Sequence, residues 1–379
     1  YLRYLGHGEL CFPRGGKLDL TGTGTVKSTG IAVNSSVVRV GDDSGEARSV
    51  ELVIGKDVVI DSPNSYGVGA FGTVTTETLT IYGTVKSTTA TNESYDGCAV
   101  TTLGTDTETP ATIIIKEDAK ISAVNTNAVY LPAGTLTVEG GEITGTTGIY
   151  FKSTNMTISG GTITGNGTKQ DYKYYGNGGI STGEAVTIDS CNYPGGIGSV
   201  VISGGTFTSA NADAVGSYNS KGGTKQTAFI TGGTFSSDPS AYVAEGCITL
   251  VNNNTFTVSN TDEIPVTAET VQDYLDGKYG SINGKTLVLA SGNYSALKLA
   301  PAAYAGSSTT YTCPHNDSTD NTGPFTSTSV VDYKQHMSDN PHHGNARIFT
   351  RTLNNLTITA QNGAEVTIAG FEILSRTYD

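Results

Sequence analysis

The sequence predicts an all-β chain of two tandem right-handed parallel β-helices, the second of which opens with a short capping helix. Three observations predict this fold. A sequence motif centred on paired glycines recurs between residues 79 and 237. The chain of 379 residues holds 49 glycines and 58 threonines, which suit tight corners and strands. Its apolar residues form short Val/Ile/Leu clusters, whereas a helical bundle would need long periodic stripes.

The repeated phrase is clearest at residues 135–145 and 155–165, where Leu136 and Met156 lie 20 residues apart. Each copy reads as a strand of alternating apolar and Thr/Ser residues, a Gly-Gly bend, a second strand and often a third, such as residues 128–131. Three short strands cannot bury their inward side alone, so successive copies are expected to stack into one apolar column. A propeller is excluded, because no period of about 40 residues with Trp-Asp signals is present. Further copies occur at residues 79–85, 113–121, 200–208 and 228–236.

The Gly-Gly phrase stops near Cys247, which places a first β-helix over residues 1–254 and a linker over 255–265. A second unit is expected over residues 266–379. It should begin with a capping helix over 267–275, with Thr267 as N-cap and with Val271, Tyr274 and Leu275 on one face. A polar, irregular insertion is expected at about residues 303–347.

Charge and hydropathy exclude two classes of partner. The net charge of −13 repels phosphate backbones, so no nucleic-acid partner is expected. No stretch reaches the roughly 18 to 20 consecutive apolar residues of a membrane span. Arg is absent from residues 49 to 346 and His from 8 to 314, which leaves most of the first unit without two common catalytic side chains.

Tyrosines supply a candidate binding site, because Tyr gives a large rigid contact area at modest entropic cost. A Tyr-rich stretch around residues 171–177 and later loops could stack sugar rings or contact a protein, or could simply fold over the solenoid. The five tyrosines concerned are Tyr172, Tyr174, Tyr175, Tyr193 and Tyr218.

The insertion supplies a candidate metal site. A Cys-Pro-His triplet and three later histidines offer ligands suited to Zn²⁺, although their spacing matches no tight template. The alternative is a solvated polar loop. No obligatory cofactor is expected, and Zn²⁺ or Ca²⁺ are the ions that the chain could bind. The five candidate ligands are Cys313, His315, His336, His342 and His343.

Carboxylates offer an enzymatic alternative, because a glycosidase needs two acids about 5 to 9.5 Å apart. Glu139 and Glu142 flank a Gly-Gly corner, and Asp171, Glu184 and Asp189 lie within reach of one coil. The sequence assigns none of them a catalytic role, since outward acids on an acidic solenoid usually serve solubility. If Asp171, Glu184 or Asp189 met a lysine in one cleft, an enzyme would be favoured.

The phrases ISGGTFTS at residues 202–209 and ITGGTFSSD at 230–238 resemble the right-handed, pectate-lyase-like β-helix repeats of large secreted or cell-surface proteins from Gram-positive, often gut-dwelling, bacteria. The resemblance covers about residues 50–250. It implies this fold and an extracellular or cell-surface location, and the family includes both adhesins and sugar-active enzymes. Polysaccharide lyases of this fold use a Ca²⁺-binding acid cluster and an Arg or Lys base. Here only a lysine such as Lys152, Lys169 or Lys173 could serve.

We therefore expect a non-catalytic stalk or adhesin segment that displays loops to a glycan or protein partner. The alternatives are a glycoside hydrolase or polysaccharide lyase on the same fold, and a receptor-binding spike that would require trimerisation.

Overall fold

A computed structural model describes residues 15–28, 35–41, 48–73, 75–89, 97–102, 111–169, 182–190, 195–219, 223–299 and 355–372, together with the backbone of a few short strands elsewhere. The chain divides into two compact units. The first comprises residues 1–244 and 253–257, and the second residues 245–252 and 258–379.

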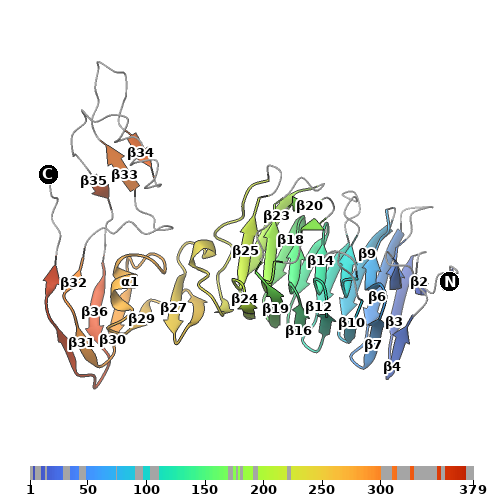
Figure 1. The fold of residues 1–379 in the computed structure, drawn as a ribbon, viewed down its shortest axis with the longest axis horizontal. Coiled ribbons are helices and arrows are strands. Elements are labelled where there is room, and N and C mark those ends of the chain that lie inside the picture. The colour runs from blue at the N-terminus through green and yellow to red at the C-terminus, as the bar shows by residue number, and fades with distance from the viewer. Residues whose placement is uncertain are drawn as a thin grey trace, which may run out of the picture. The chain divides into compact units, whose positions relative to one another are not determined.

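Unit 1 is a parallel β-helix (Figure 1), in which each coil contributes one strand to each of three sheets. Seven coils follow one another, from β3–β4–β5 to β23–β24–β25. We call the three sheets A, B and C. Sheet B consists of β3 (Gly16–Leu20), β6 (Arg48–Ile54), β9 (Thr75–Ile81), β12 (Thr112–Ile115), β15 (Thr135–Val138), β18 (Thr154–Ile158) and β23 (Ile197–Ile202).

Sheet C follows sheet B around each coil. It contains β4 (Gly24–Lys27), β7 (Val58–Ser62), β10 (Thr84–Ser87), β13 (Lys120–Ala123), β16 (Glu142–Gly145), β19 (Thr162–Thr168), β24 (Thr206–Asn211) and β26 (Gly233–Phe235).

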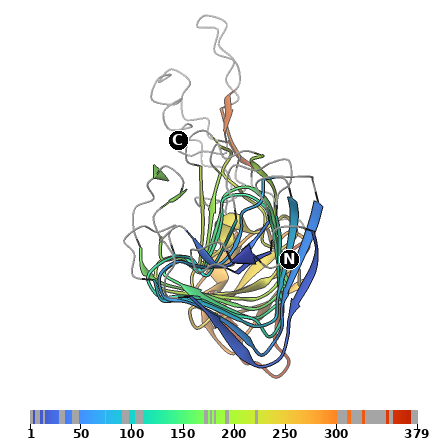
Figure 2. The same cartoon turned by 90° about the vertical axis from the view of Figure 1, so that its right-hand side faces the viewer.

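Sheet A completes the coil and adds an antiparallel strand pair, β1 with β2, at its N-terminal end. Figure 2 looks along the coils, whose strands superpose from one coil to the next. The strands of sheet A are β1 (Arg3–Tyr4), β2 (Leu10–Phe12), β5 (Ser36–Val40), β8 (Tyr66–Ala70), β11 (Val100–Thr102), β14 (Val129–Leu131), β17 (Ile149–Phe151), β22 (Val186–Asp189) and β25 (Val215–Tyr218).

The core of unit 1 is a set of apolar ladders that run across the coils, because parallel register places like residues beside like. In sheet B, Leu136 pairs with Met156 in the next coil, as the 20-residue spacing predicts. In sheet C the ladder ends in Phe207 and Phe235, whose rings stack with centroids 4.7 Å apart. Each such side chain is fully buried, and burial of one contributes roughly 1.5–3 kcal/mol.

The corners between sheets B and C are tight, with only two to four residues between the strands of each coil. The predicted Gly-Gly bends lie here. Gly161 has a φ of +91°, and a Cβ added to it would lie 2.8 Å from the backbone oxygen of Gly140 in the preceding coil. Glycine is therefore required at this corner both by backbone conformation and by close coil packing.

One predicted strand of unit 1 is nearly absent. Residues 228–231 were expected to form a strand, but only Ile230 makes isolated bridges, to Ile202 and Val243. Ala228 has a φ of +55°, which ends regular pairing, and the aromatic ring of Phe229 stacks on Tyr242 instead.

Unit 2 contains two coils of parallel β-structure preceded by three strands and a short helix. The pairs are β30 with β36, β31 with β37 and β32 with β38, all parallel. Its elements are β27 (Ile248–Asn252), β28 (Thr255–Ser259, which begins in unit 1), β29 (Glu263–Val266), α1 (Val271–Leu275), β30 (Thr286–Leu289), β31 (Gly292–Tyr294), β32 (Leu297–Lys298), β36 (Thr357–Ala360), β37 (Val366–Ile368) and β38 (Phe371–Glu372).

The predicted linker over residues 255–265 is wrong, because β28 and most of β29 occupy it. The alternation of buried and exposed residues explains the difference. Ile264 and Val266 are both buried, with one residue between them, and β29 pairs in parallel with β30. A linker would have no such buried side.

The capping helix is shorter than predicted. It begins at Val271, although Thr267 opens the turn that leads into it, since the Thr267 carbonyl accepts a hydrogen bond from the Val271 N–H at 3.0 Å. The predicted face is confirmed, because Val271, Tyr274 and Leu275 are all buried.

The insertion was expected to be irregular, and that expectation is wrong in part. Its strands β33 and β34, together with β35 just beyond residue 347, form a small antiparallel sheet in the order β34-β33-β35. They are β33 (Thr310–Cys313), β34 (Phe325–Ser327) and β35 (Ile348–Thr350).

The corner glycines yield a stability prediction. Gly161→Ala should destabilise unit 1 by more than the roughly 1–2 kcal/mol of a left-handed backbone, because its Cβ would also meet the preceding coil. Urea unfolding followed by circular dichroism measures this. Gly196→Ala is the matched control, since Gly196 has a φ of +57° but open space around its Cβ position. Equal losses for the two variants would show that coil packing does not constrain the corner.

Candidate functional site

The outer face of sheet A differs from the outer faces of sheets B and C, because its polar side chains are buried. Along each strand, residues alternate between the apolar column and this outer face. Tyr130, Tyr150 and Thr187 lie at one outward row of successive coils and are 5 % exposed or less. Buried polar groups require partners, and two clusters of such groups surround Glu184 and Asp189.

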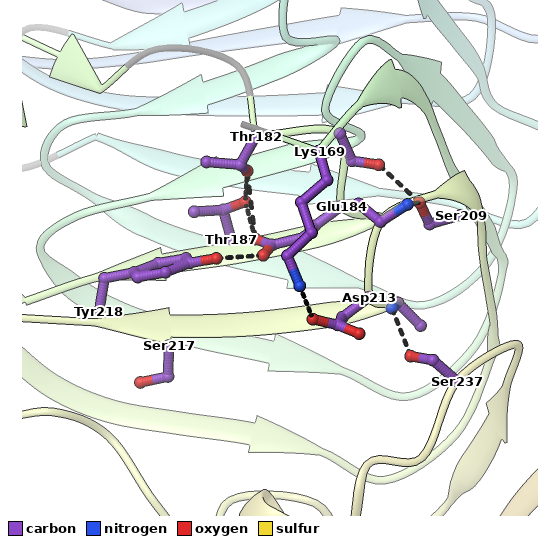
Figure 3. Close-up of polar contacts among 12 residues, drawn as sticks. Lys169, Thr182, Glu184, Thr187, Ser209, Asp213, Ser217, Tyr218 and Ser237 are labelled. Atoms are coloured by element: carbon purple, nitrogen blue, oxygen red, sulfur yellow. Dashed lines mark hydrogen bonds and ion pairs between the residues drawn. The ribbon is translucent and has the colours of Figure 1, made fainter. Parts of the chain in front are cut away.

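The first cluster surrounds Glu184, which is only 1 % exposed. Its Oε2 atom accepts hydrogen bonds from the hydroxyls of Thr187 at 2.6 Å and Thr182 at 3.1 Å. Its Oε1 atom accepts one from the hydroxyl of Tyr218 on the next coil (Figure 3). Gly216 leaves room for this carboxyl group, because a Cβ there would overlap it.

The preceding coil positions this cluster. The Thr147 hydroxyl oxygen accepts the backbone N–H groups of Thr182 at 2.9 Å and Gly183 at 3.2 Å. The Ser209 hydroxyl in turn donates to the Gly183 carbonyl at 2.7 Å. Neighbouring coils therefore hold Glu184 from both sides.

Burial raises the pKa of Glu184 above that of an ordinary glutamate, against the opposing effect of its three hydroxyl donors. The pKa of Tyr218 is raised as well, first by burial and then by the neighbouring Glu184 carboxyl group. The net shift is therefore upward, which stabilises the neutral form of Glu184 relative to that of an exposed glutamate.

An exposed ion pair lies beside the Glu184 cluster. Lys169 Nζ is 2.6 Å from Asp213 Oδ2, with about half of each side chain exposed (Figure 3). The hydrogen bond to Asp213 raises the pKa of Lys169, and the Glu184 carboxyl group adds to this rise. Nearby, the Tyr242 hydroxyl oxygen accepts the Ser217 backbone N–H at 3.3 Å.

The second cluster is a fully buried ion pair. Lys152 Nζ lies 3.7 Å from Asp189 Oδ2, and both side chains are 0 % exposed. The Tyr150 hydroxyl donates to the same Asp189 oxygen at 3.3 Å. Phe151 and Ile188 are register partners, so Lys152 and Asp189 occupy the next position on adjacent coils.

Glu139 and Glu142 are not part of either cluster. They lie at a tight corner between sheets B and C, where both Glu139 oxygens accept hydrogen bonds from Lys116 at 2.7 Å and Glu142 is exposed. These two carboxylates therefore do not share a site with Glu184 or Asp189.

Of the five tyrosines predicted to bind a partner, Tyr218 is half-buried and turned toward Glu184. Tyr174 and Tyr175 form β20 (Tyr174–Tyr175), which pairs antiparallel with β21 (Gly178–Gly179). The side chains of these two residues, and Tyr172 and Tyr193 entirely, lie outside the described residues, as do Asp171 and Lys173.

The predicted metal ligands also lie outside the described residues, apart from the backbone of Cys313 in β33. In the part of the chain that the structure describes, no group of three or more His, Cys, Asp or Glu side chains is arranged to hold a metal ion. Among those same residues, no helix has the length and apolar character needed to cross a membrane.

Sequence reasoning named Glu184, Tyr218, Asp189 and Lys152 but did not pair them, and it missed the other residues of the Glu184 site. Thr182, Thr187 and Asp213 carry no motif of their own. Alignment of the phrases GIYFK at 148–152, AVTID at 185–189 and AVGSY at 214–218 would have placed Lys152, Asp189 and Tyr218 in one row.

No protein-family model, curated protein or solved structure matches this chain. The geometry of the site is therefore the basis for a functional proposal.

The Glu184 cluster predicts a pH dependence of stability. A carboxyl group whose pKa is raised by folding stabilises the fold below its ordinary pKa, and that contribution is lost as pH rises through the folded value. Wild-type stability should therefore fall as pH rises from about 4 to the pKa of Glu184 in the folded protein, and Glu184→Gln should reduce this fall. Urea unfolding midpoints across a pH series measure it. Tyr218→Phe should move the fall to higher pH, because it removes a hydrogen bond that lowers the pKa of Glu184.

Glu142→Gln serves as the control, since Glu142 is exposed on sheet C. If Glu142→Gln changed the pH profile as much as Glu184→Gln does, the buried cluster would not be the source of the effect.

Proposed function

We propose that the chain is a non-catalytic binding scaffold, an adhesin or stalk segment of a secreted or cell-surface protein, which presents loops beside sheet A to a neutral glycan. The observation that carries this proposal is the position of the connections that vary in length between coils. In the seven coils of unit 1, every connection longer than four residues enters or leaves sheet A, as with residues 88–99, 103–111 and 169–185.

Unit 2 repeats this arrangement within its own coils. Its long insertion, between β32 and β36, follows the third strand of a coil, the position that sheet A occupies in unit 1. Loops on a rigid scaffold are the usual sites of binding, because they tolerate change that the packed coils do not. The same edge of the coil thus carries the variable segments in both units.

The chemistry of this edge supports a neutral glycan. The Tyr-rich segment around residues 171–177 lies in the connection from β19 to β22, and tyrosine faces stack on sugar rings while their hydroxyls bond sugar hydroxyls. A net charge of −13 opposes anionic polymers. A location outside the cell, and kinship with pectate-lyase-like repeats, are parts of the same proposal.

The alternative is a carbohydrate-active enzyme, favoured by one observation: Glu184, with its raised pKa, lies near the Asp213 carboxylate and Lys169. An acid and a carboxylate are the pair that glycosidases use. Against it, Glu184 is 1 % exposed and both its oxygens already accept hydrogen bonds. A substrate would have to displace these donors, so the binding scaffold accounts better for the geometry.

A glycan array probed with the purified chain, with release of reducing ends measured on every glycan that binds, tests this proposal. We expect binding without cleavage, and a loss of binding of roughly tenfold or more when Tyr174 and Tyr175 are changed to Ala, since truncation of an aromatic hot-spot residue costs roughly 2 kcal/mol or more. Thr206→Ala with Thr208→Ala, on the outer face of sheet C, should leave binding unchanged.

Two outcomes would contradict the proposal. Release of reducing ends that disappears in Glu184→Gln would establish the enzyme. Failure to bind any neutral glycan, together with saturable binding to a purified protein, would assign the loops to a protein partner.

A further inference from the structure

The buried pair of Lys152 and Asp189 is not used by the proposed function, and its surroundings suit a covalent reaction. The two residues occupy equivalent positions on adjacent coils, with Nζ and Oδ2 3.7 Å apart and no solvent exposure on either side chain. The pair of Lys169 and Asp213 in the same region is closer, at 2.6 Å, but about half exposed. The two pairs therefore differ in burial, and burial determines how strongly water stabilises the two charges of each pair.

Burial of a lysine and an aspartate as separate ions is costly, because each loses its hydration. Transfer of one proton from the ammonium to the carboxylate removes both charges. It leaves an amine beside a carboxylic acid, and these are the two reactants of amide formation. Water is excluded from the site, so the condensation that releases water is favoured over its reversal.

The geometry points to an intramolecular amide bond between Lys152 Nζ and Asp189 Cγ. The lone pair of Nζ attacks Cγ and forms the C–N bond. One C–O bond of the carboxylic acid then breaks, and its hydroxyl leaves as water with a proton from the amine. No oxidant, reductant or further reactant is needed, since nothing is oxidised or reduced.

The Tyr150 side chain assists this step. The Tyr150 hydroxyl, which donates to Asp189 Oδ2 at 3.3 Å, would stabilise the negative charge that develops on that oxygen. Parallel register fixes both reactants, which replaces a bimolecular encounter by a step within one fold.

The bond would close a covalent loop from residue 152 to residue 189, which contains the whole connection between β19 and β22. Coils carrying β17 and β22 could then not be pulled apart without breaking a covalent bond. This inference stands independently of the proposed function.

Mass spectrometry of the full chain tests the bond. The denatured protein should be lighter than its sequence by one water molecule. Trypsin should fail to cut after Lys152 and should yield a branched peptide that joins Lys152 to Asp189. A succinimide at Asp96-Gly97 or Asp276-Gly277 gives the same loss of water, but it leaves Lys152 open to trypsin.

Variants complete the test. Lys152→Met should restore the sequence mass, whereas Lys169→Met should keep the loss of water, because the exposed pair does not react. An unmodified wild-type mass, or ordinary cleavage after Lys152, overturns the inference. This readout needs only the wild-type chain, so it holds even if Lys152→Met fails to fold.

Discussion

Stacking of each coil on the next in parallel register is the interaction on which the rest of this structure depends. A single coil has three short strands and no interior of its own, so its apolar side chains are buried only when a neighbour repeats them in register. The ladders through Leu136 and Met156 in sheet B, and through Phe207 and Phe235 in sheet C, are that repetition. The tight glycine corners follow from it, since a Cβ at Gly161 would hold two coils apart.

The same register explains why polar residues can be buried outside the apolar column. Once coils are fixed at one spacing, a side chain on the outer face of sheet A meets the same few neighbours above and below. Glu184 reaches Tyr218 on the next coil, and Lys152 reaches Asp189. Unlike these contacts, the ion pair of Lys116 and Glu139 lies at an exposed corner and adds little to stability.

Much of the fold could be predicted from the sequence, because the signals of a solenoid are local. Alternation and Gly-Gly bends lie within one coil, so strands such as 135–138 and the buried face of the helix at Val271 were found directly. Residues 255–265 were misread because two strands there lack the glycine pair. The candidate site was found only in part. Asp213 lies near Glu184 but comes from the next coil, and because the coils are separated by connections of unequal length, no spacing in the sequence encodes that meeting.

Uniform coil spacing also means that distances along unit 1 are multiples of one fixed step. Its seven coils are separated by six steps of about 4.8 Å each, or roughly 29 Å from the first coil to the last. Duplication or loss of one coil in evolution would shift everything beyond it by one such step without disturbing the packing inside any coil. The distance between two loops on this unit therefore changes by whole coil spacings. Selection could adjust that distance through the number of coils, without any change to the contacts within a coil.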